Sequence, residues 1–191
     1  MQRLDRFCEA FLYAATLHAH QRRKVSGEPY LAHLLGVTAI ALQYGADENE
    51  AIAALLHDAV EDQGGVATRE EIGRLFGRVV VEIVDGCTDA DTSPKPPWRQ
   101  RKEAYLARLP HASASVRLVS AADKLHNARA LVQEYRLRGE SLWAHFRGGR
   151  DGTLWYYRAV TNALKLPGGT PLVEELDRTV SELERLAGIS A

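Results

Sequence analysis

The chain has 191 residues, of which 46% are hydrophobic and 26% are charged, and its formal net charge is −1. This length and balance predict one folded domain, and the near-neutral charge argues against nucleic acid or a membrane surface as a partner. Two cysteines, Cys8 and Cys87, do not make a disulfide framework. No stretch has the apolar length of a signal-peptide core or a membrane span. We therefore expect a cytoplasmic protein, and the sequence leaves its oligomeric state open.

The first half of the chain shows the spacing of amphipathic helices. Apolar residues recur every three or four positions from Leu4 and predict a helix that ends near His20. Residues 21–29 form a basic loop that ends in a breaker cluster, and the next helix runs from Pro29 to about residue 44. Asp47 and Glu50 form a capping box that opens a third helix, which is expected to continue to about residue 62.

The second half is also expected to be helical. A capping box at Thr68 and Glu71 predicts a helix over residues 69–76. Residues 79–84 are rich in β-branched side chains, but Glu82 and Asp85 break a period-two pattern, which favours a helix. The prolines of residues 89–97 predict a loop. Further helices are expected over residues 98–109, from 115 to about 135, through Trp155 to 166, and over 170–187. The predicted fold class is all-α, a compact helical bundle that forms a single domain over residues 1–191.

Ionisable side chains crowd the end of the otherwise apolar third helix. His57 and Glu61 are four residues apart, as are Asp58 and Asp62, so each pair lies on one side of a helix. Three carboxylates within five positions repel one another unless a cation or solvent relieves the repulsion. The local pattern alone is compatible with a solvated helix end as well as with a cation site.

Two further residues change that balance. Asp123 follows apolar and small residues in a helix that is expected to be buried, where an unpaired charge is costly, although a surface pair with Lys124 would explain it equally well. His33 lies on the helix behind Pro29, where a lone histidine is usually structural. Two histidines and two aspartates together are typical of a divalent metal with room for water, rather than a closed structural zinc site.

The arrangement of these residues resembles the HD superfamily of metal-dependent phosphohydrolases. It is most similar to the hydrolase domain of the RelA/SpoT proteins and to the small alarmone hydrolases, including the animal Mesh1 type. The resemblance covers about residues 5–165 and is carried by residues 18–24 (HAHQRRK), 26–33 (SGEPYLAH), 54–62 (ALLHDAVED) and 122–127 (ADKLHN).

This resemblance implies a compact HD-domain bundle and a reaction, namely removal of the 3′-pyrophosphate from ppGpp or pppGpp to give GDP or GTP. It implies that one Mn²⁺ ion is bound by His33, His57, Asp58 and Asp123. Glu61 and Asp62 would orient or deprotonate the attacking water. Arg23, Lys24 and Asn127 are the expected substrate contacts, and Lys95 and Tyr156 are weaker candidates.

Two other functions use the same residues. One is a different HD-type nucleotide phosphohydrolase, which acts on a deoxynucleotide or on a 2′- or 3′-phosphorylated nucleotide such as NADPH. The other is a non-catalytic nucleotide sensor. The Arg23-Lys24 loop and the Glu61-Asp62 pair favour the alarmone hydrolase, because a generic HD core requires neither.

Overall fold

The structure is a computed structural model that describes residues 5–89 and 94–189. Within these residues the chain forms α-helices and short 3₁₀ helices, and its one extended pairing is an isolated bridge between Arg22 and Pro29. The all-α prediction is therefore confirmed. The helices are α1 (Asp5–Leu17), α2 (Tyr30–Gln43), α3 (Glu48–Leu56), α4 (Ala59–Gln63), α5 (Gly65–Phe76), α6 (Arg78–Cys87), α7 (Trp98–Arg108), η1 (Leu109–His111), α8 (Ala114–Arg138), η2 (Gly139–His145), α9 (Gly149–Lys165) and α10 (Pro171–Leu186).

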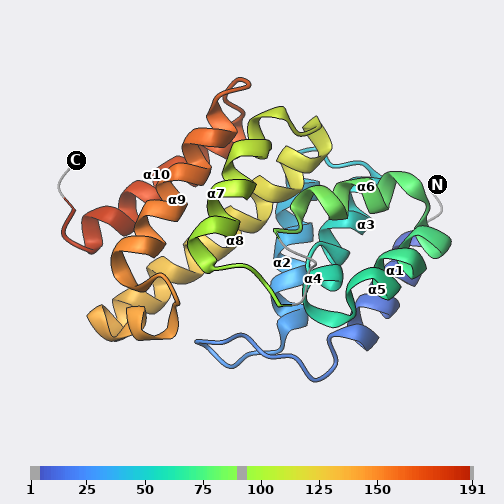
Figure 1. Cartoon of the computed structure of the whole chain (residues 1–191), viewed down its shortest axis with the longest axis horizontal. Helices are drawn as coiled ribbons and strands as arrows, with labels where there is room; N and C mark the ends of the chain where they lie inside the picture. The colour runs from blue at the N-terminus through green and yellow to red at the C-terminus, as the bar shows by residue number, and fades with distance from the viewer. Residues whose placement is uncertain (1–4, 90–93, 190–191) are drawn as a thin grey trace.

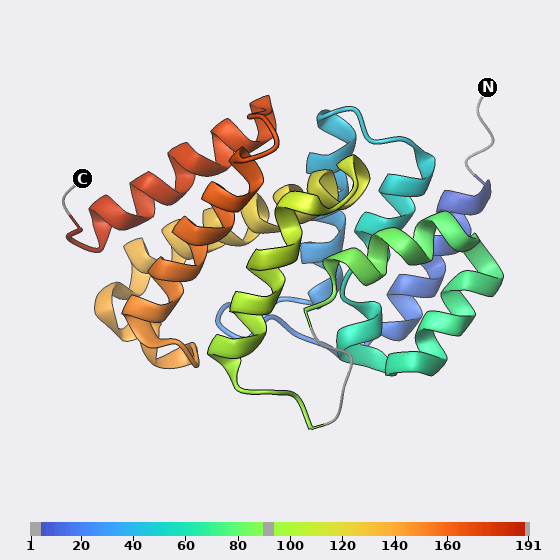
Figure 2. The same ribbon diagram turned by 45° about the horizontal axis from the view of Figure 1, so that its top comes forward.

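The long helix α8 lies at the centre of the arrangement. It packs against α2, α3 and α6 on one side and against α9 and α10 on the other. Figure 1 shows α1 to α6 gathered at one end of the molecule and α9 and α10 at the other, and Figure 2 shows α7 between the two groups. Because α8 contacts both groups, its side chains can take part in any site that lies between them. In the described part of the chain, no helix has both the length and the apolar character needed to cross a membrane.

Several local predictions are confirmed. The Asp47–Glu50 capping box is present in both directions, with Glu50 N donating to Asp47 Oδ1 at 2.9 Å and Asp47 N donating to Glu50 Oε2 at 2.8 Å. Residues 79–84 are helical, and α6 buries one face that contains Val80, Ile83 and Val84. Leu4 and residues 90–93 of the expected loop lie outside the described residues.

Three predicted boundaries are wrong. The helix expected from Asp47 to about residue 62 is divided into α3 and α4 by a turn at His57 and Asp58. The expected Thr68–Glu71 capping box is absent, because α5 already begins at Gly65 and Thr68 is buried inside it. Gly65 has a φ of +58°, and this left-handed conformation turns the chain from α4 directly into α5. The first helix ends at Leu17 rather than near residue 20.

Candidate active site

Two histidines and two aspartates from three parts of the chain converge at the turn between α3 and α4. Ligand atoms of His33, His57 and Asp58 lie within 4.8 Å of one another and could hold a metal ion. Asp123 Oδ1 lies 3.4 Å from His33 Nε2 and 3.6 Å from His57 Nε2. Both Nε2 atoms are buried and have no hydrogen-bond partner among the described residues. Buried polar atoms are normally satisfied, so two unpartnered imidazole nitrogens beside two carboxylates fit a divalent cation.

The helix break explains how adjacent residues can face the same point. His57 caps α3 and Asp58 precedes α4, so the two side chains leave a turn rather than opposite sides of one helix. His57 Nδ1 lies 2.9 Å from the carbonyl oxygen of Ala54. His33 Nδ1 lies 3.0 Å from Nδ1 of His126 on α8. These contacts hold both imidazole rings with Nε2 directed toward the aspartates.

The electrostatics of this group favour ionised carboxylates. Burial by itself would raise the pKa of Asp58, but the neighbouring imidazoles of His57 and His33 hold it well below the usual range. Burial likewise opposes ionisation of Asp123, yet the Lys124 ammonium and the two histidines hold its pKa well below the usual range. Ionised carboxylates are the form that binds a cation, so both aspartates are available as ligands.

Glu61 and Asp62 lie on α4, one helical turn beyond His57 and Asp58. Glu61 Oε1 accepts a hydrogen bond from Lys95 Nζ at 2.9 Å, and Asp62 Oδ2 accepts one from Gln21 Nε2 at 2.8 Å. Burial raises the pKa of both carboxyl groups, with a further contribution from the charge of Asp89 at Glu61 and of Asp58 at Asp62. A raised carboxyl pKa suits a group that exchanges protons near neutral pH.

One cavity opens from this cluster, and a second cavity adjoins it. The smaller is polar, has a volume of 200 Å³ and is lined by Asp58, Glu61, Asp62 and Asp123. The larger has a volume of 360 Å³ and lies between the loop over residues 21–28 and the C-terminal half of α8. Tyr30 and Asn127 line both cavities. Apolar and aromatic residues line part of the larger cavity, namely Val25, Leu131, Leu142, Phe146 and Tyr157.

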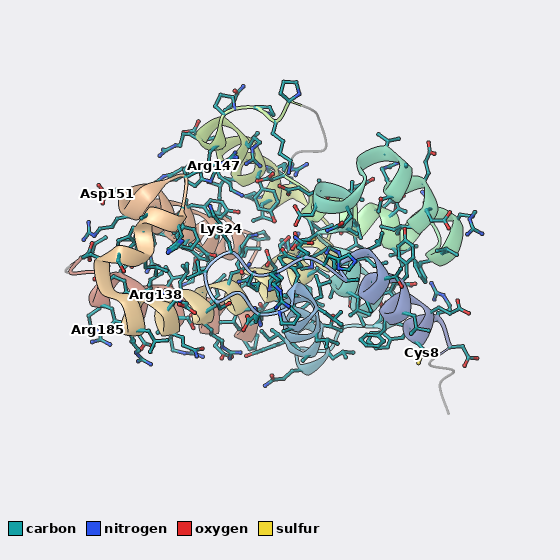
Figure 3. All side chains as sticks on the ribbon, turned by 90° about the horizontal axis from the view of Figure 1, so that it is seen from below. Cys8, Lys24, Arg138, Arg147, Asp151 and Arg185 are labelled. Carbon is teal, nitrogen blue, oxygen red and sulfur yellow. The ribbon has the colours of Figure 1, made fainter. Side chains whose placement is uncertain are left out.

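Four of the five expected substrate contacts line these cavities, and the fifth, Lys95, lines neither. Arg23 and Lys24 line the larger cavity, and Arg23 Nη2 donates to Asn127 Oδ1 at 2.7 Å. Figure 3 shows Lys24 on the loop beside the part of α8 that carries Arg138. Tyr156 instead lines the smaller cavity, where its hydroxyl is buried without a hydrogen-bond partner among the described residues. Lys95 is paired with Glu61.

Sequence reasoning gave no role to several residues that shape the site. The Tyr30 hydroxyl donates to Asp58 Oδ2 at 2.6 Å. Tyr30 lies three residues before His33 within residues 26–33, so the sequence could have indicated its role. Gln21, which binds Asp62, also lies in a quoted motif. No sequence pattern marks the ion pairs of Asp89 with Arg101 and Lys102, because these pairs join the end of one helix to a polar helix further along the chain.

Comparisons with known proteins agree with this geometry. The profile of the HD domain family matches residues 10–154. Guanosine-3′,5′-bis(diphosphate) 3′-pyrophosphohydrolase MESH1 of Xenopus tropicalis is 44% identical over 126 residues, which cover 64% of this chain and 68% of that protein. Human MESH1 is 41% identical over 147 residues, which cover 71% of this chain and 79% of that protein.

A solved structure supports the same relationship across almost the whole chain. It is described as a metazoan ortholog of SpoT that hydrolyzes ppGpp and plays a role in starvation responses, and it superposes with a TM-score of 0.77. The two proteins are 28% identical, and the match covers 97% of each chain. The chain therefore belongs to the HD domain family and, within it, to the MESH1 group.

Proposed function

We propose that this chain is a Mn²⁺-dependent guanosine-3′,5′-bis(diphosphate) 3′-pyrophosphohydrolase, which converts ppGpp to GDP and pppGpp to GTP with release of pyrophosphate. The MESH1 relatives carry this activity in their names. The observation that carries the proposal is the position of the His33 and His57 Nε2 atoms, which have no partner among the described residues, beside Asp58 and Asp123. These two aspartates line a polar cavity that adjoins a second one of nucleoside size. This arrangement suits a nucleotide whose reacting phosphate lies at a cation in the polar cavity while its base lies in the larger cavity.

The cation would be held by His33, His57, Asp58 and Asp123. Two imidazole nitrogens and two carboxylate oxygens form a mixed donor set that suits Mn²⁺ among other divalent ions. A bound ion would supply Lewis-acid activation of water and of a phosphoryl oxygen. Tyr30 supports the ligand set, because its hydroxyl donates to Asp58 and thereby fixes the orientation of that carboxylate.

Glu61 and Asp62 would move the protons of the reaction. A water oxygen bonds to the phosphorus on ribose O3′, the bond between phosphorus and O3′ breaks, and O3′ takes up a proton. One carboxylate can therefore accept the proton of water while the other donates a proton to O3′. The raised pKa values of Glu61 and Asp62 are consistent with both tasks. Lys95 would hold Glu61 in position through their ion pair.

The larger cavity would hold the guanosine. Arginine can stack on a purine and bind phosphate, and Lys24 adds a second cation on the same loop. Asn127 links the two cavities, because its side chain accepts from Arg23 and donates to Asp123. Tyr156 would face the phosphates in the smaller cavity.

Product analysis tests the proposal. Purified protein with Mn²⁺ should release GDP and pyrophosphate from ppGpp and leave GDP, GTP and ATP nearly unchanged. Comparable hydrolysis of GTP, or release of single phosphate from ppGpp or NADPH, would indicate a different HD-type phosphohydrolase. If the protein binds ppGpp tightly but hydrolyses it with none of the divalent metal ions tested, it is a nucleotide sensor.

A further inference from the structure

Two lysines in the polar cavity have no role in the chemistry described above. Lys102 on α7 and Lys124 on α8 both line it, and their side chains are only 18% and 14% exposed. Lys102 Nζ donates to Asp89 Oδ2 at 2.5 Å, and Lys124 Nζ donates to Asp123. Because an ammonium group has three hydrogens, each lysine still has donors for a further acceptor.

The two ammonium groups converge on one aromatic ring. Lys102 Nζ lies 4.7 Å and Lys124 Nζ lies 5.9 Å from the centre of the Tyr156 ring. Burial, together with the charge of Lys124, lowers the pKa of Lys102. Like charges in a buried cavity repel each other, and an anion between them would remove that repulsion. The Tyr156 hydroxyl, which is buried and unpartnered among the described residues, is a third donor at this point.

Asp123 fixes where this donor group lies relative to the histidines. Its Oδ1 faces His33 and His57, whereas its Oδ2 accepts from Lys124. Lys124 therefore lies across one carboxylate from His33 and His57, and Lys102 lines the same cavity. A phosphate at the histidine side would place a second phosphate, joined to it through one bridging oxygen, toward Lys124 and Lys102.

We propose that Lys102, Lys124 and the Tyr156 hydroxyl form a subsite for the terminal phosphate of the 3′-pyrophosphate. This inference rests on the proposed function and extends it, because such a subsite would favour a 3′-diphosphate over a 3′-monophosphate. The carboxylates that line the cavity would repel a pyrophosphate. The lysines, together with a divalent ion at the histidines, offset that charge.

The test compares two ligands on the Mn²⁺-loaded protein at one fixed concentration of free Mn²⁺. Lys102→Gln removes one ammonium group, while Asp89 keeps its partner Arg101. The dissociation constant for inorganic pyrophosphate, measured by calorimetry, should rise roughly 10- to 100-fold, the usual effect of losing a charged hydrogen bond. The dissociation constant for GDP should stay the same, because its base and ribose lie in the larger cavity.

Two matched variants make the result specific. Lys165→Gln removes a lysine that is paired with Asp177 and lines neither cavity, so it should change neither constant. Arg23→Ala should weaken GDP binding and leave pyrophosphate binding unchanged. Tyr156→Phe removes only the hydroxyl, so it tests the subsite even if Lys102→Gln fails to fold. It should weaken the binding of pyrophosphate and leave the binding of GDP unchanged.

The outcomes separate this inference from the proposed function. Unchanged pyrophosphate binding in both Lys102→Gln and Tyr156→Phe would overturn the subsite, as would an equal loss of GDP and pyrophosphate binding. If the wild-type protein binds pyrophosphate in a Lys102-dependent way but does not cleave ppGpp, the subsite stands and the proposed function fails.

Discussion

His126 offers a test of the candidate metal centre that leaves every proposed ligand in place. For His33 Nε2 to bind a cation, its lone pair must be free and the proton must reside on Nδ1. That proton then points at His126 Nδ1, 3.0 Å away, which acts as the acceptor. The corresponding acceptor for His57 is the backbone oxygen of Ala54, which no substitution removes. The Nδ1 proton of His33 thus has a side-chain acceptor, whereas that of His57 has a main-chain acceptor.

We expect His126→Leu to weaken Mn²⁺ binding by roughly 10- to 100-fold, the usual effect of removing the hydrogen-bond partner of a metal-bound histidine. This range corresponds to about 1.4–2.7 kcal/mol. His126→Asn places an amide oxygen at nearly the reach of Nδ1, so it should retain most of the affinity. Packing at this point is tight, because a Cβ added at Gly36 would lie 2.2 Å from His126 Nε2. Loss of stability must therefore be measured separately.

Two measurements on the same purified variants decide the question. Mn²⁺ titration followed by electron paramagnetic resonance gives the affinity, and thermal unfolding of the metal-free protein reports the packing cost. We expect similar unfolding temperatures for the two variants and weaker metal binding in the leucine variant alone. Full Mn²⁺ affinity in His126→Leu would refute this role of His126, and so would equal loss of affinity in His126→Asn.

The remaining predictions separate metal binding, chemistry and substrate binding. Asp123→Ala should abolish Mn²⁺ binding and turnover while the helix content by circular dichroism stays unchanged, since alanine is the better helix former; retained metal would remove Asp123 from the ligand set. Glu61→Gln and Asp62→Asn should keep Mn²⁺ and lower kcat by roughly 10²–10⁴, as measured by pyrophosphate release, and normal turnover in both would exclude the proton-transfer role. Arg23→Ala should lower kcat/KM for ppGpp by roughly 10- to 100-fold with unchanged Mn²⁺ affinity, whereas a parallel loss of metal would place Arg23 in the structural support of the centre.

Sequence periodicity predicted most of the helices, because burial of one face at intervals of three and four residues leaves a direct trace in the sequence. It failed where tertiary contacts set a boundary. The Thr68–Glu71 pair satisfies the local pattern of a capping box, yet Thr68 is buried inside α5. The break at His57 was equally hidden, since residues 51–62 have no glycine or proline that would end a helix.

The candidate site shows the same division. His33, His57 and Asp123 stand in short motifs, so their residue types and spacing could indicate a metal site from sequence. Asp89 and Lys102 stand in no such motif. They reach the site only because α7 packs near α4 and α8. His126 lies in a quoted motif, but its contact with His33 joins residues 93 positions apart, and only the fold reveals it.

Helix α8 explains how one bundle can hold both ends of a nucleotide. Asp123, Asn127 and Leu131 are spaced four residues apart, so they lie along one side of the helix. Asp123 faces the histidines, Asn127 lines both cavities and Leu131 lines the larger one. Eight residues of α-helix span about 12 Å at 1.5 Å per residue. A single rigid helix, packed against both groups of helices, therefore sets the distance between the point where a phosphate would react and the pocket where a base would bind.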